Sequence, residues 1–179
     1  QSKEDSDIFN RFALAGYDLI QTWDGYVYHM TCRGSRFKDG ALRNPAGQVF
    51  MKGRESDEWL AQNLKSIRKW GHMVQHDELM NPIIPPKYDI GFKVYRTDIN
   101  LLRELEPWCN RIYLDSGSDY MHAYKKEEQQ NTMFNLDDRI KLYGTADITK
   151  YHDIVVEFDA QKLTSDNFQI LVNLSKLIQ

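Results

Sequence analysis

Three prolines fall within the six residues Asn81-Pro-Ile-Ile-Pro-Pro86, and they limit where regular structure can form. Proline has no amide hydrogen to donate and restricts its own backbone, so such a segment resists both a helix and a central strand. We therefore predict a linker over residues 81–86. It would separate an N-terminal region, residues 1–80, from a C-terminal domain, residues 87–179.

The C-terminal region has the pattern of a small sheet domain. Ile90, Phe92 and Val94 alternate with other residues over 89–96, as in a strand with one buried face. Thr97 or Asp98 would cap a helix, and Thr164 would cap a last one. The expected apolar positions of the two helices are Leu101, Leu105 and Trp108, then Phe168, Leu171, Leu174 and Ile178.

Further strands are expected over residues 111–114, 139–143 and 153–158, and the polar stretch 116–136 is expected to be irregular. The resulting order is β-α-β, an insert, then β-β-α. This order predicts a mixed α/β (α+β) fold in which a small sheet carries its helices on one face.

The N-terminal region is less regular. A short helix is expected over residues 7–15, because Ile8, Phe12 and Ala15 share one face and Gly16 can end it. Two strand candidates follow at 17–23 and 26–30, and then a basic, glycine-containing loop at 31–54. A second helix is expected over 56–70, with Leu60, Leu64 and Ile67 on its apolar side and Gly71 at its end.

Composition excludes several classes of protein. Lys and Arg total 23 against 26 Asp and Glu, so the formal charge of −3 does not suit a general nucleic-acid binder. No run approaches the roughly 20 apolar residues that span a bilayer, so we expect no transmembrane segment. Cys32 and Cys109 alone make no disulfide framework. A reducing, cytoplasmic location is the expectation.

The first 72 residues resemble a known enzyme family. Glu4-Asp5-Ser6-Asp7 precedes a helix that contains Arg11 and ends at Ala15-Gly16-Tyr17. Tyr28-His29 and then Lys69-Trp70-Gly71 follow in order. This order is similar to the C-terminal half of the catalytic domain of family 2-type inverting glycosyltransferases of the GT-A fold. The resemblance implies a GT-A-like part over residues 1–80, followed by a domain of unknown role over 87–179.

Inverting glycosyl transfer needs a carboxylate that takes the proton of the attacking hydroxyl, and positive charge on the departing diphosphate. By resemblance, Asp5 is the candidate general base. Glu4, Asp7 and Arg11 would lie on the acceptor side or support the base. Two arginines of the following loop, Arg33 and Arg36, would contact the diphosphate, and His29 would bind the metal.

The resemblance also implies a divalent metal, Mn²⁺ or Mg²⁺, a nucleotide-sugar donor and a saccharide or lipid-linked acceptor. Members of the family carry their nucleotide-binding units and an Asp-x-Asp metal motif well upstream of the Glu-Asp pair. Because this chain has no such segment before Glu4, we expect it to be a truncated or excised part of a transferase, inactive in isolation.

Other interpretations stay open. The acids at 4–7 also suit a plain helix start. His29 could be a structural imidazole and the arginines a solvated loop. His72 and His76 have the spacing of a helical metal site, but the glutamate of a His-Glu-x-x-His motif is missing. The alternative function is a non-catalytic binding or interaction module attached to a glycosyltransferase.

Overall fold

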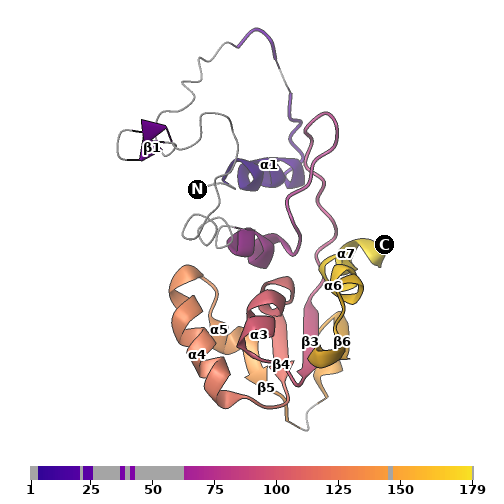
Figure 1. Cartoon of the computed structure of the whole chain (residues 1–179). Coiled ribbons are helices and arrows are strands. Elements are labelled where there is room, and N and C mark those ends of the chain that lie inside the picture. Colours follow the sequence, from indigo (N-terminus) through magenta and orange to yellow (C-terminus); the bar gives the residue numbers. More distant parts are fainter. Residues whose placement is uncertain are drawn as a thin grey trace. The chain divides into compact units, whose positions relative to one another are not determined.

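The computed structural model describes residues 4–20, 22–25, 37–38, 41–42, 63–144 and 147–178 (Figure 1). The chain divides into two compact units, residues 1–62 and residues 63–179. The fold is mixed α/β, as the sequence predicts. Each unit is considered below by itself.

In the first unit, helix α1 spans Glu4–Leu14 and confirms the predicted N-terminal helix. Gly16 ends it in a left-handed conformation, at a φ of 78°, and the Tyr17 amide bonds back to the Phe12 carbonyl. The predicted strand at 17–23 is wrong for its described residues, which have no regular structure. Tyr17 and Trp23 are exposed there, so their alternating spacing is not stabilised by packing against another element.

The other elements described in the first unit are two short strands, β1 (Phe37–Lys38) and β2 (Ala41–Leu42), which pair antiparallel. They fall within the expected loop 31–54, most of which lies outside the described residues. The strand candidate at 26–30 also lies outside them.

The second unit begins before the proline-rich segment. Residues 63–70 are helical, which agrees with the described part of the predicted helix 56–70. This helix belongs to the same unit as the sheet, so the division at residue 62 differs from the expected linker at 81–86. The physical reason is an ionic network: Arg68 of the helix is buried against Glu106, beyond the prolines.

The proline-rich segment is extended and partly attached. His76 and Pro82 form an isolated antiparallel bridge, and the Ile83 amide bonds to the Gln75 carbonyl. Pro85 is buried. The prolines therefore prevent a helix or sheet strand, as predicted, without separating the flanking residues into independent bodies.

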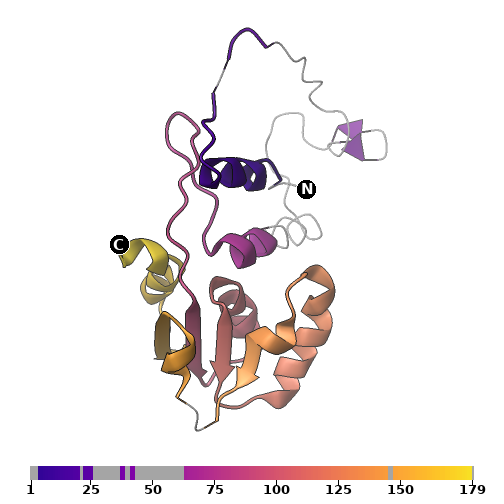
Figure 2. The ribbon, with the colours of Figure 1, turned by 180° about the vertical axis from the view of Figure 1, so that it is seen from behind.

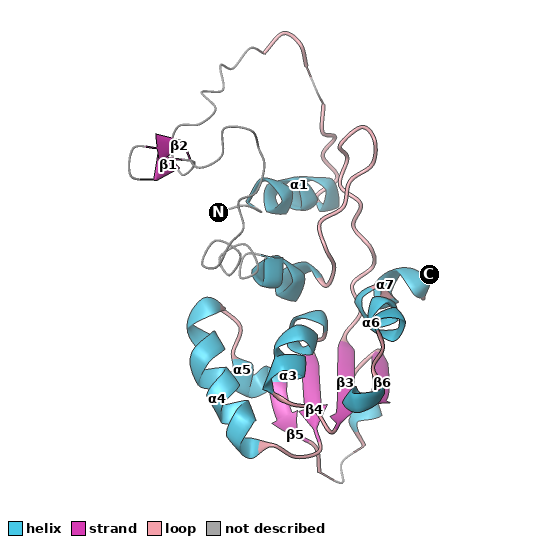
Figure 3. Cartoon of the chain, in the orientation of Figure 1, coloured by secondary structure: helices cyan, strands magenta, loops and turns pink. Residues whose placement is uncertain are grey.

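Among the described residues of this unit, a four-stranded parallel sheet has the order β5-β4-β3-β6 (Figure 3). The strands are β3 (Ile90–Tyr95), β4 (Arg111–Leu114), β5 (Ile140–Leu142) and β6 (Ile154–Asp159). All four predicted strands are confirmed, with ends shifted by at most one residue. The register pairs Phe92 with Ile112 and with Val156, which places their side chains on one face.

Helices cover that face. α3 (Ile99–Leu105) follows β3 and is capped by Asp98, whose carboxylate accepts from the Asn100 and Leu101 amides. α6 (Ser165–Val172) is capped by Thr164, as predicted, and ends near α7 (Leu174–Leu177). Seen from behind, the strands lie in front of α3 and α4 (Figure 2). Leu102, rather than Leu101, is the fully buried α3 residue beside Leu105.

The insert 116–136 is a correction, because much of it is helical. α4 (Ser118–Glu128) is followed by the short helices η3 (Gln129–Asn131) and α5 (Leu136–Arg139). The stretch is polar overall, yet Met121, Tyr124 and Leu136 are buried in the core. These few apolar side chains suffice because α4 crosses from β4 to β5 and needs only a narrow stripe against the sheet.

The remaining connections are short 3₁₀ helices: η2 (Glu106–Trp108), η4 (Ile148–Tyr151) and η5 (Ala160–Lys162). Cys109 follows η2 as a buried free thiol. Burial raises the pKa of this thiol well above its ordinary value. In the part of the chain that the structure describes, no helix is long and apolar enough to cross a bilayer.

The buried ionic network lies on the helix side of the sheet. Glu106, with no exposed surface, accepts from Arg68 Nε and Nη2 at 2.9 and 2.7 Å and from the Tyr124 hydroxyl at 3.1 Å. Arg139 donates to the other carboxylate oxygen, and Arg68 also pairs with Glu128 at 2.8 Å. Two arginines thus balance two glutamates. Such pairing is what makes buried charge tolerable.

Candidate functional site

The predicted site residues that are described lie on α1. Asp5 is exposed in its first turn. Asp7 and Arg11, one helical turn apart, form an ion pair with 3.1 Å between Arg11 Nε and Asp7 Oδ2. Glu4 begins the helix, although its side chain lies outside the described part. The structure therefore brings Asp7 and Arg11 together.

The other predicted residues, His29, Arg33 and Arg36, lie outside the described residues. Their roles in binding a metal and a diphosphate stay predictions. Among the described residues there is no group of three or more His, Cys, Asp or Glu side chains that could hold a metal ion. A Mn²⁺ or Mg²⁺ site remains an expectation of the resemblance.

The geometry points instead to the carboxyl ends of the strands. In open α/β sheets, ligands bind outside these ends, close to the point where successive connections leave in opposite directions. Here the chain passes from β3 to β4 on one side and returns to place β6 on the other side of β3. Residues at the ends of β3 and β6 therefore occupy the position typical of a binding site.

Arg96, directly after β3, has a left-handed backbone with a φ of 52°. For an arginine such a conformation is uncommon and needs support from its surroundings. Its amide donates to the Asp115 carboxylate at 3.1 and 3.3 Å, and its Nε donates to Asp159 Oδ1 at 3.0 Å. Asp115 directly follows β4 and Asp159 is the last residue of β6, so Arg96 joins the ends of three adjacent strands.

A second cluster lies on the sheet face opposite the helices. Side chains alternate along a strand, so Lys93 and Tyr95 of β3 point away from the helices, together with Glu157 of β6. Glu157 accepts from the Tyr95 hydroxyl and from Lys93 Nζ, the latter at 3.2 Å. Tyr143, just after β5, meets Tyr95 edge to face with ring centroids 5.6 Å apart.

We call Lys93, Tyr95, Tyr143 and Glu157 the open-face cluster. The Lys93 ammonium lies over both tyrosine rings, at 5.4 and 4.8 Å from their centroids. The Lys93 and Glu157 side chains keep 23% and 52% of their surface exposed. The cluster thus combines aromatic, cationic and anionic groups within reach of a ligand from solvent.

The contacts within the open-face cluster shift its titrations. Hydrogen bonds from Tyr95 and Lys93 lower the pKa of Glu157 below its ordinary value. The hydrogen bonds of Lys93 to Tyr95 and Glu157 raise the pKa of its ammonium. Partial burial and the neighbouring Tyr95 raise the pKa of Tyr143. At neutral pH the cluster therefore holds the Glu157 carboxylate, the Lys93 ammonium and a neutral Tyr143.

The loop after β4 supports this end of the sheet. Gly117 has a φ of 98°, and a Cβ atom there would lie 1.7 Å from the Tyr120 ring. The Tyr120 hydroxyl donates to the Ser116 carbonyl at 2.9 Å. Burial and the nearby carboxylates of Asp115 and Asp98 raise the pKa of Tyr120 to about 12. Only glycine fits at 117, and its turn positions Asp115.

At the amino end of the sheet, three polar side chains form a hydrogen-bonded series. His152 Nδ1 lies 2.7 Å from Asp89 Oδ1, and its Nε2 lies 2.9 Å from the Tyr113 hydroxyl. A carboxylate, an imidazole and a hydroxyl in line are also the parts of a catalytic triad. The His152 side chain is 3% exposed and Tyr113 is buried, however, so a substrate cannot reach the hydroxyl. We infer that this hydrogen-bonded series has a structural role and holds three strands in register.

No family model, curated protein or solved structure matches the chain. The resemblance to family 2-type glycosyltransferases therefore remains a prediction from the motifs in residues 4–71.

Sequence reasoning missed the open-face cluster, although a signal was present. Over 91–95 and 155–159 the residues between the apolar positions include Lys93, Tyr95 and Glu157. Their alternation places them on the face away from the core. What the pattern does not contain is the strand order that sets Glu157 beside Lys93, or the loop that brings Tyr143 against Tyr95.

Proposed function

We propose that residues 63–179 form a binding module for a saccharide, with the open-face cluster as its binding surface. The observation that supports this proposal is the Tyr95–Tyr143 pair, flanked by Lys93 and Glu157, at the carboxyl end of the sheet. Tyrosine rings offer an apolar body with a polar tip, and their faces suit the C–H faces of a sugar ring. Carboxylate and ammonium groups accept from and donate to hydroxyl groups.

The charges at this edge favour an uncharged, hydroxyl-rich ligand over a diphosphate. Lys93 pairs with Glu157, and Arg96 pairs with Asp159. Asp115 and Asp98 add further negative charge nearby. A phosphate would have to compete with these carboxylates for the cations, whereas a saccharide can hydrogen-bond to both partners of each pair. The proposal agrees with the binding module that the sequence offers as its alternative function.

The test is to titrate the protein with maltotetraose, cellotetraose and chitotetraose and to monitor binding by NMR chemical shifts. We expect at least one of them to shift the resonances of Lys93, Tyr95 and Tyr143. The Tyr95→Ala variant should bind it about tenfold more weakly, as loss of one aromatic contact implies. Tyr151→Ala, which removes an exposed tyrosine from η4, is the matched control. Silence with all three sugars, or equal losses in both variants, would contradict the proposal.

A second candidate is catalysis of glycosyl transfer, with Asp5 as the general base. The observation that favours it is the start of α1, where Asp5 is exposed while Arg11 pairs with Asp7 one turn further on. The transferase would use a nucleotide sugar, a saccharide or lipid-linked acceptor, and Mn²⁺ or Mg²⁺.

Calorimetric titration of the chain with UDP and with GDP, each with and without Mn²⁺, tests whether the chain contributes residues to the donor-binding site. Metal-dependent binding would support the transferase and direct attention to His29, Arg33 and Arg36. In a transferase assay of the protein that contains this chain, Asp5→Asn should lower turnover by orders of magnitude and leave donor binding unchanged. Asp18→Asn, an exposed aspartate after α1, is the control. Unchanged turnover of Asp5→Asn would remove Asp5 from the role.

A further inference from the structure

Strand β6 forms an open edge of the sheet. In the order β5-β4-β3-β6, its neighbour among the described strands is β3 alone. β6 is six residues long, whereas β5 at the opposite edge has three. An edge strand presents backbone N–H and C=O groups on which another strand can pair, and many proteins limit such pairing by keeping edge strands short. The length of β6 leaves room for a further strand.

The register shows which backbone groups of β6 point outward. The Ile154 amide donates to the Asp89 carbonyl at 3.1 Å, and Ile154 pairs with Ile90 of β3. In a parallel ladder, alternate residues of a strand bond to a given neighbour. The amide and carbonyl groups of Val155 and Glu157 therefore point away from β3. No described residue forms a hydrogen bond with these groups, so a strand from outside can bond to them.

An apolar groove of about 360 Å³ lies beside this edge, on the helix side of the sheet. Its walls are Val156 and Phe158 of β6, Ile170 and Leu171 of α6, and Leu163 between the two elements. Val156 and Phe158 pack against the core yet remain partly exposed, and Ile170 keeps 50% of its surface exposed. The volume lies in the usual range of ligand pockets, roughly 300–1,000 Å³. The groove can therefore receive aliphatic side chains of a strand that pairs with β6.

The two faces of β6 differ in charge, and this difference selects the partner. The residues that point toward the helices are all apolar: Ile154, Val156 and Phe158. Those on the opposite face, counted from the residue before the strand, are mostly acidic: Asp153, Val155, Glu157 and Asp159. Lys93 and Arg96 pair with two of these acids, while Asp153 and Glu157 remain exposed. An added strand with apolar side chains on one face and cations on the other complements both faces.

A second copy of the chain suits this edge less well. In a two-fold dimer the two β6 strands would pair antiparallel, with their acidic faces on the same side of the joined sheet. Like charges opposite one another destabilise a strand pair. Lys162 lines the groove, on the apolar side, so it does not face the cations of an added strand.

We propose that the β6 edge and its groove bind an extended peptide segment of another protein, in which apolar residues alternate with lysine or arginine. Its backbone bonds to Val155 and Glu157, and its apolar side chains enter the groove. Its cations lie beside Asp153 and Glu157. In such strand addition, the backbone supplies affinity and the alternate side chains supply specificity.

The probe is the peptide Ac-Leu-Lys-Leu-Lys-Leu-NH₂, titrated into the protein and followed by NMR. We expect a submillimolar Kd. At saturation, hydrogen exchange of the Val155 and Glu157 amides should slow about tenfold, because they gain hydrogen bonds, while the Ile154 amide, already bonded to β3, changes less. Ac-Lys-Lys-Leu-Leu-Leu-NH₂ has the same composition without the alternation, and Ac-Leu-Glu-Leu-Glu-Leu-NH₂ has the opposite charge. Each should bind about tenfold more weakly.

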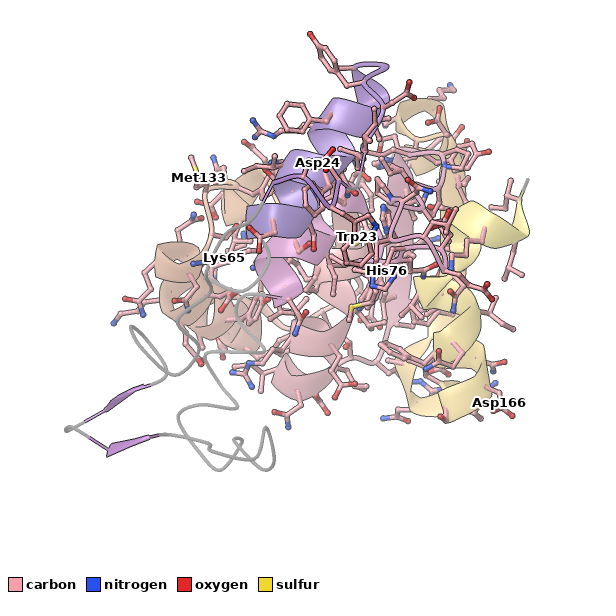
Figure 4. The ribbon with its side chains drawn as sticks, turned by 90° about the horizontal axis from the view of Figure 1, so that it is seen from above. Trp23, Asp24, Lys65, His76, Met133 and Asp166 are labelled. Atoms are coloured by element: carbon pink, nitrogen blue, oxygen red, sulfur yellow. The ribbon has the colours of Figure 1, made fainter. Side chains whose placement is uncertain are left out.

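Two pairs of variants test the groove and the acidic face. Ile170→Ala should weaken binding of the alternating peptide about fivefold, while Ile178→Ala, a similarly exposed isoleucine at the end of α7, should leave it unchanged. Asp153→Asn should weaken it about threefold. The control Asp166→Asn changes an exposed aspartate that projects from the first turn of α6 (Figure 4). All four residues are exposed, so the variants should fold.

Equal binding of the three peptides, unchanged exchange at Val155 and Glu157, or equal affinities of Ile170→Ala and Ile178→Ala would overturn the proposal. So would a concentration-dependent dimer in which these two amides are already protected, because the edge would then be an interface between copies. None of the substituted residues belongs to the open-face cluster. Saccharide binding should therefore be the same in all four variants, and failure of this proposal leaves the saccharide proposal to its own test.

Discussion

A cation, a carboxylate and a tyrosine meet on each face of the sheet. On the helix side Arg68, Glu106 and Tyr124 are sealed in the core, and on the other side Lys93, Glu157 and Tyr95 remain open to solvent. The chemistry is nearly the same, but the surroundings differ. Buried charges leave water at a large cost and are destabilising when one partner is lost, whereas exposed pairs contribute little to stability. We therefore assign the buried trio to the fold, and the open trio belongs to the proposed saccharide-binding surface.

The largest expected effect comes from breaking the buried trio. Glu106→Gln removes the carboxylate shared by Arg68 and Arg139, which leaves two buried cations against Glu128 alone, and should lower the free energy of unfolding by about 3–5 kcal/mol. Urea denaturation followed by circular dichroism measures the loss. Glu104→Gln, two residues away and exposed on α3, is the control and should change the free energy of unfolding little. Equal stabilities of the two variants would contradict the assignment.

A smaller effect on the free energy of unfolding is expected in the turn that follows β4. Gly117→Ala should cost about 2–4 kcal/mol of unfolding free energy, because alanine is strained at a positive φ and its Cβ displaces the Tyr120 ring. Gly144→Ala, where no atom lies within 4 Å of the added Cβ, should be tolerated. Thermal unfolding of both variants gives the comparison. A native-like melting temperature for Gly117→Ala would rule out the proposed support of Asp115.

His72 should make the stability of the sheet unit depend on pH. Its pKa is lower in the folded protein than the ordinary 6.5, so the unfolded chain binds more protons below that pH. The free energy of unfolding should then fall as the pH drops from about 7 to about 5. His72→Phe should remove this part of the pH dependence, and the exposed control His76→Phe should keep it. A native pH profile in His72→Phe would contradict the buried neutral imidazole.

The smallest effect on stability, with the largest contrast in function, is expected at the open trio. Glu157→Gln should leave urea denaturation almost unchanged, since the pair is exposed, while saccharide binding decreases. The pKa of Glu157 is lowered in the folded protein. Its small contribution to the free energy of unfolding is therefore present above the unfolded pKa of 4.5 and is lost as the pH falls through the lower folded pKa. Urea denaturation from neutral to acid pH follows this loss, and saccharide titrations over the same range show whether binding weakens as the carboxylate is protonated. If Glu157→Gln destabilises the protein as Glu106→Gln does, the contrast between the faces fails.

Much of the sheet unit could be predicted from sequence. The alternation of Ile90, Phe92 and Val94, and the caps at Asp98 and Thr164, identify strands and helices through local periodicity and local hydrogen bonds. The helix α4 was missed because its buried side chains are few among many polar ones. The strand at 17–23 was predicted wrongly because spacing alone shows no partner.

The candidate sites depended more on long-range contacts. Asp5, Asp7 and Arg11 could be selected because they fall in a short local motif that resembles the glycosyltransferase pattern, and the structure pairs Asp7 with Arg11 through one helical turn. Lys93 and Glu157 are 64 residues apart, and neither is unusual by itself. Nor does any local pattern distinguish His72, whose lowered pKa comes from burial in the packed unit.

The sequence by itself determined the mixed α/β class, the four strands of the sheet, the capped starts of α3 and α6, and the proline segment that neither a helix nor a strand occupies. These follow from interactions between residues a few positions apart. Only the tertiary structure decided that helix 63–70 joins the sheet unit through Glu106, that β6 lies beside β3, and which polar groups are buried or open. Those outcomes depend on contacts between distant residues, and the burial of a charge is a property of the packed chain.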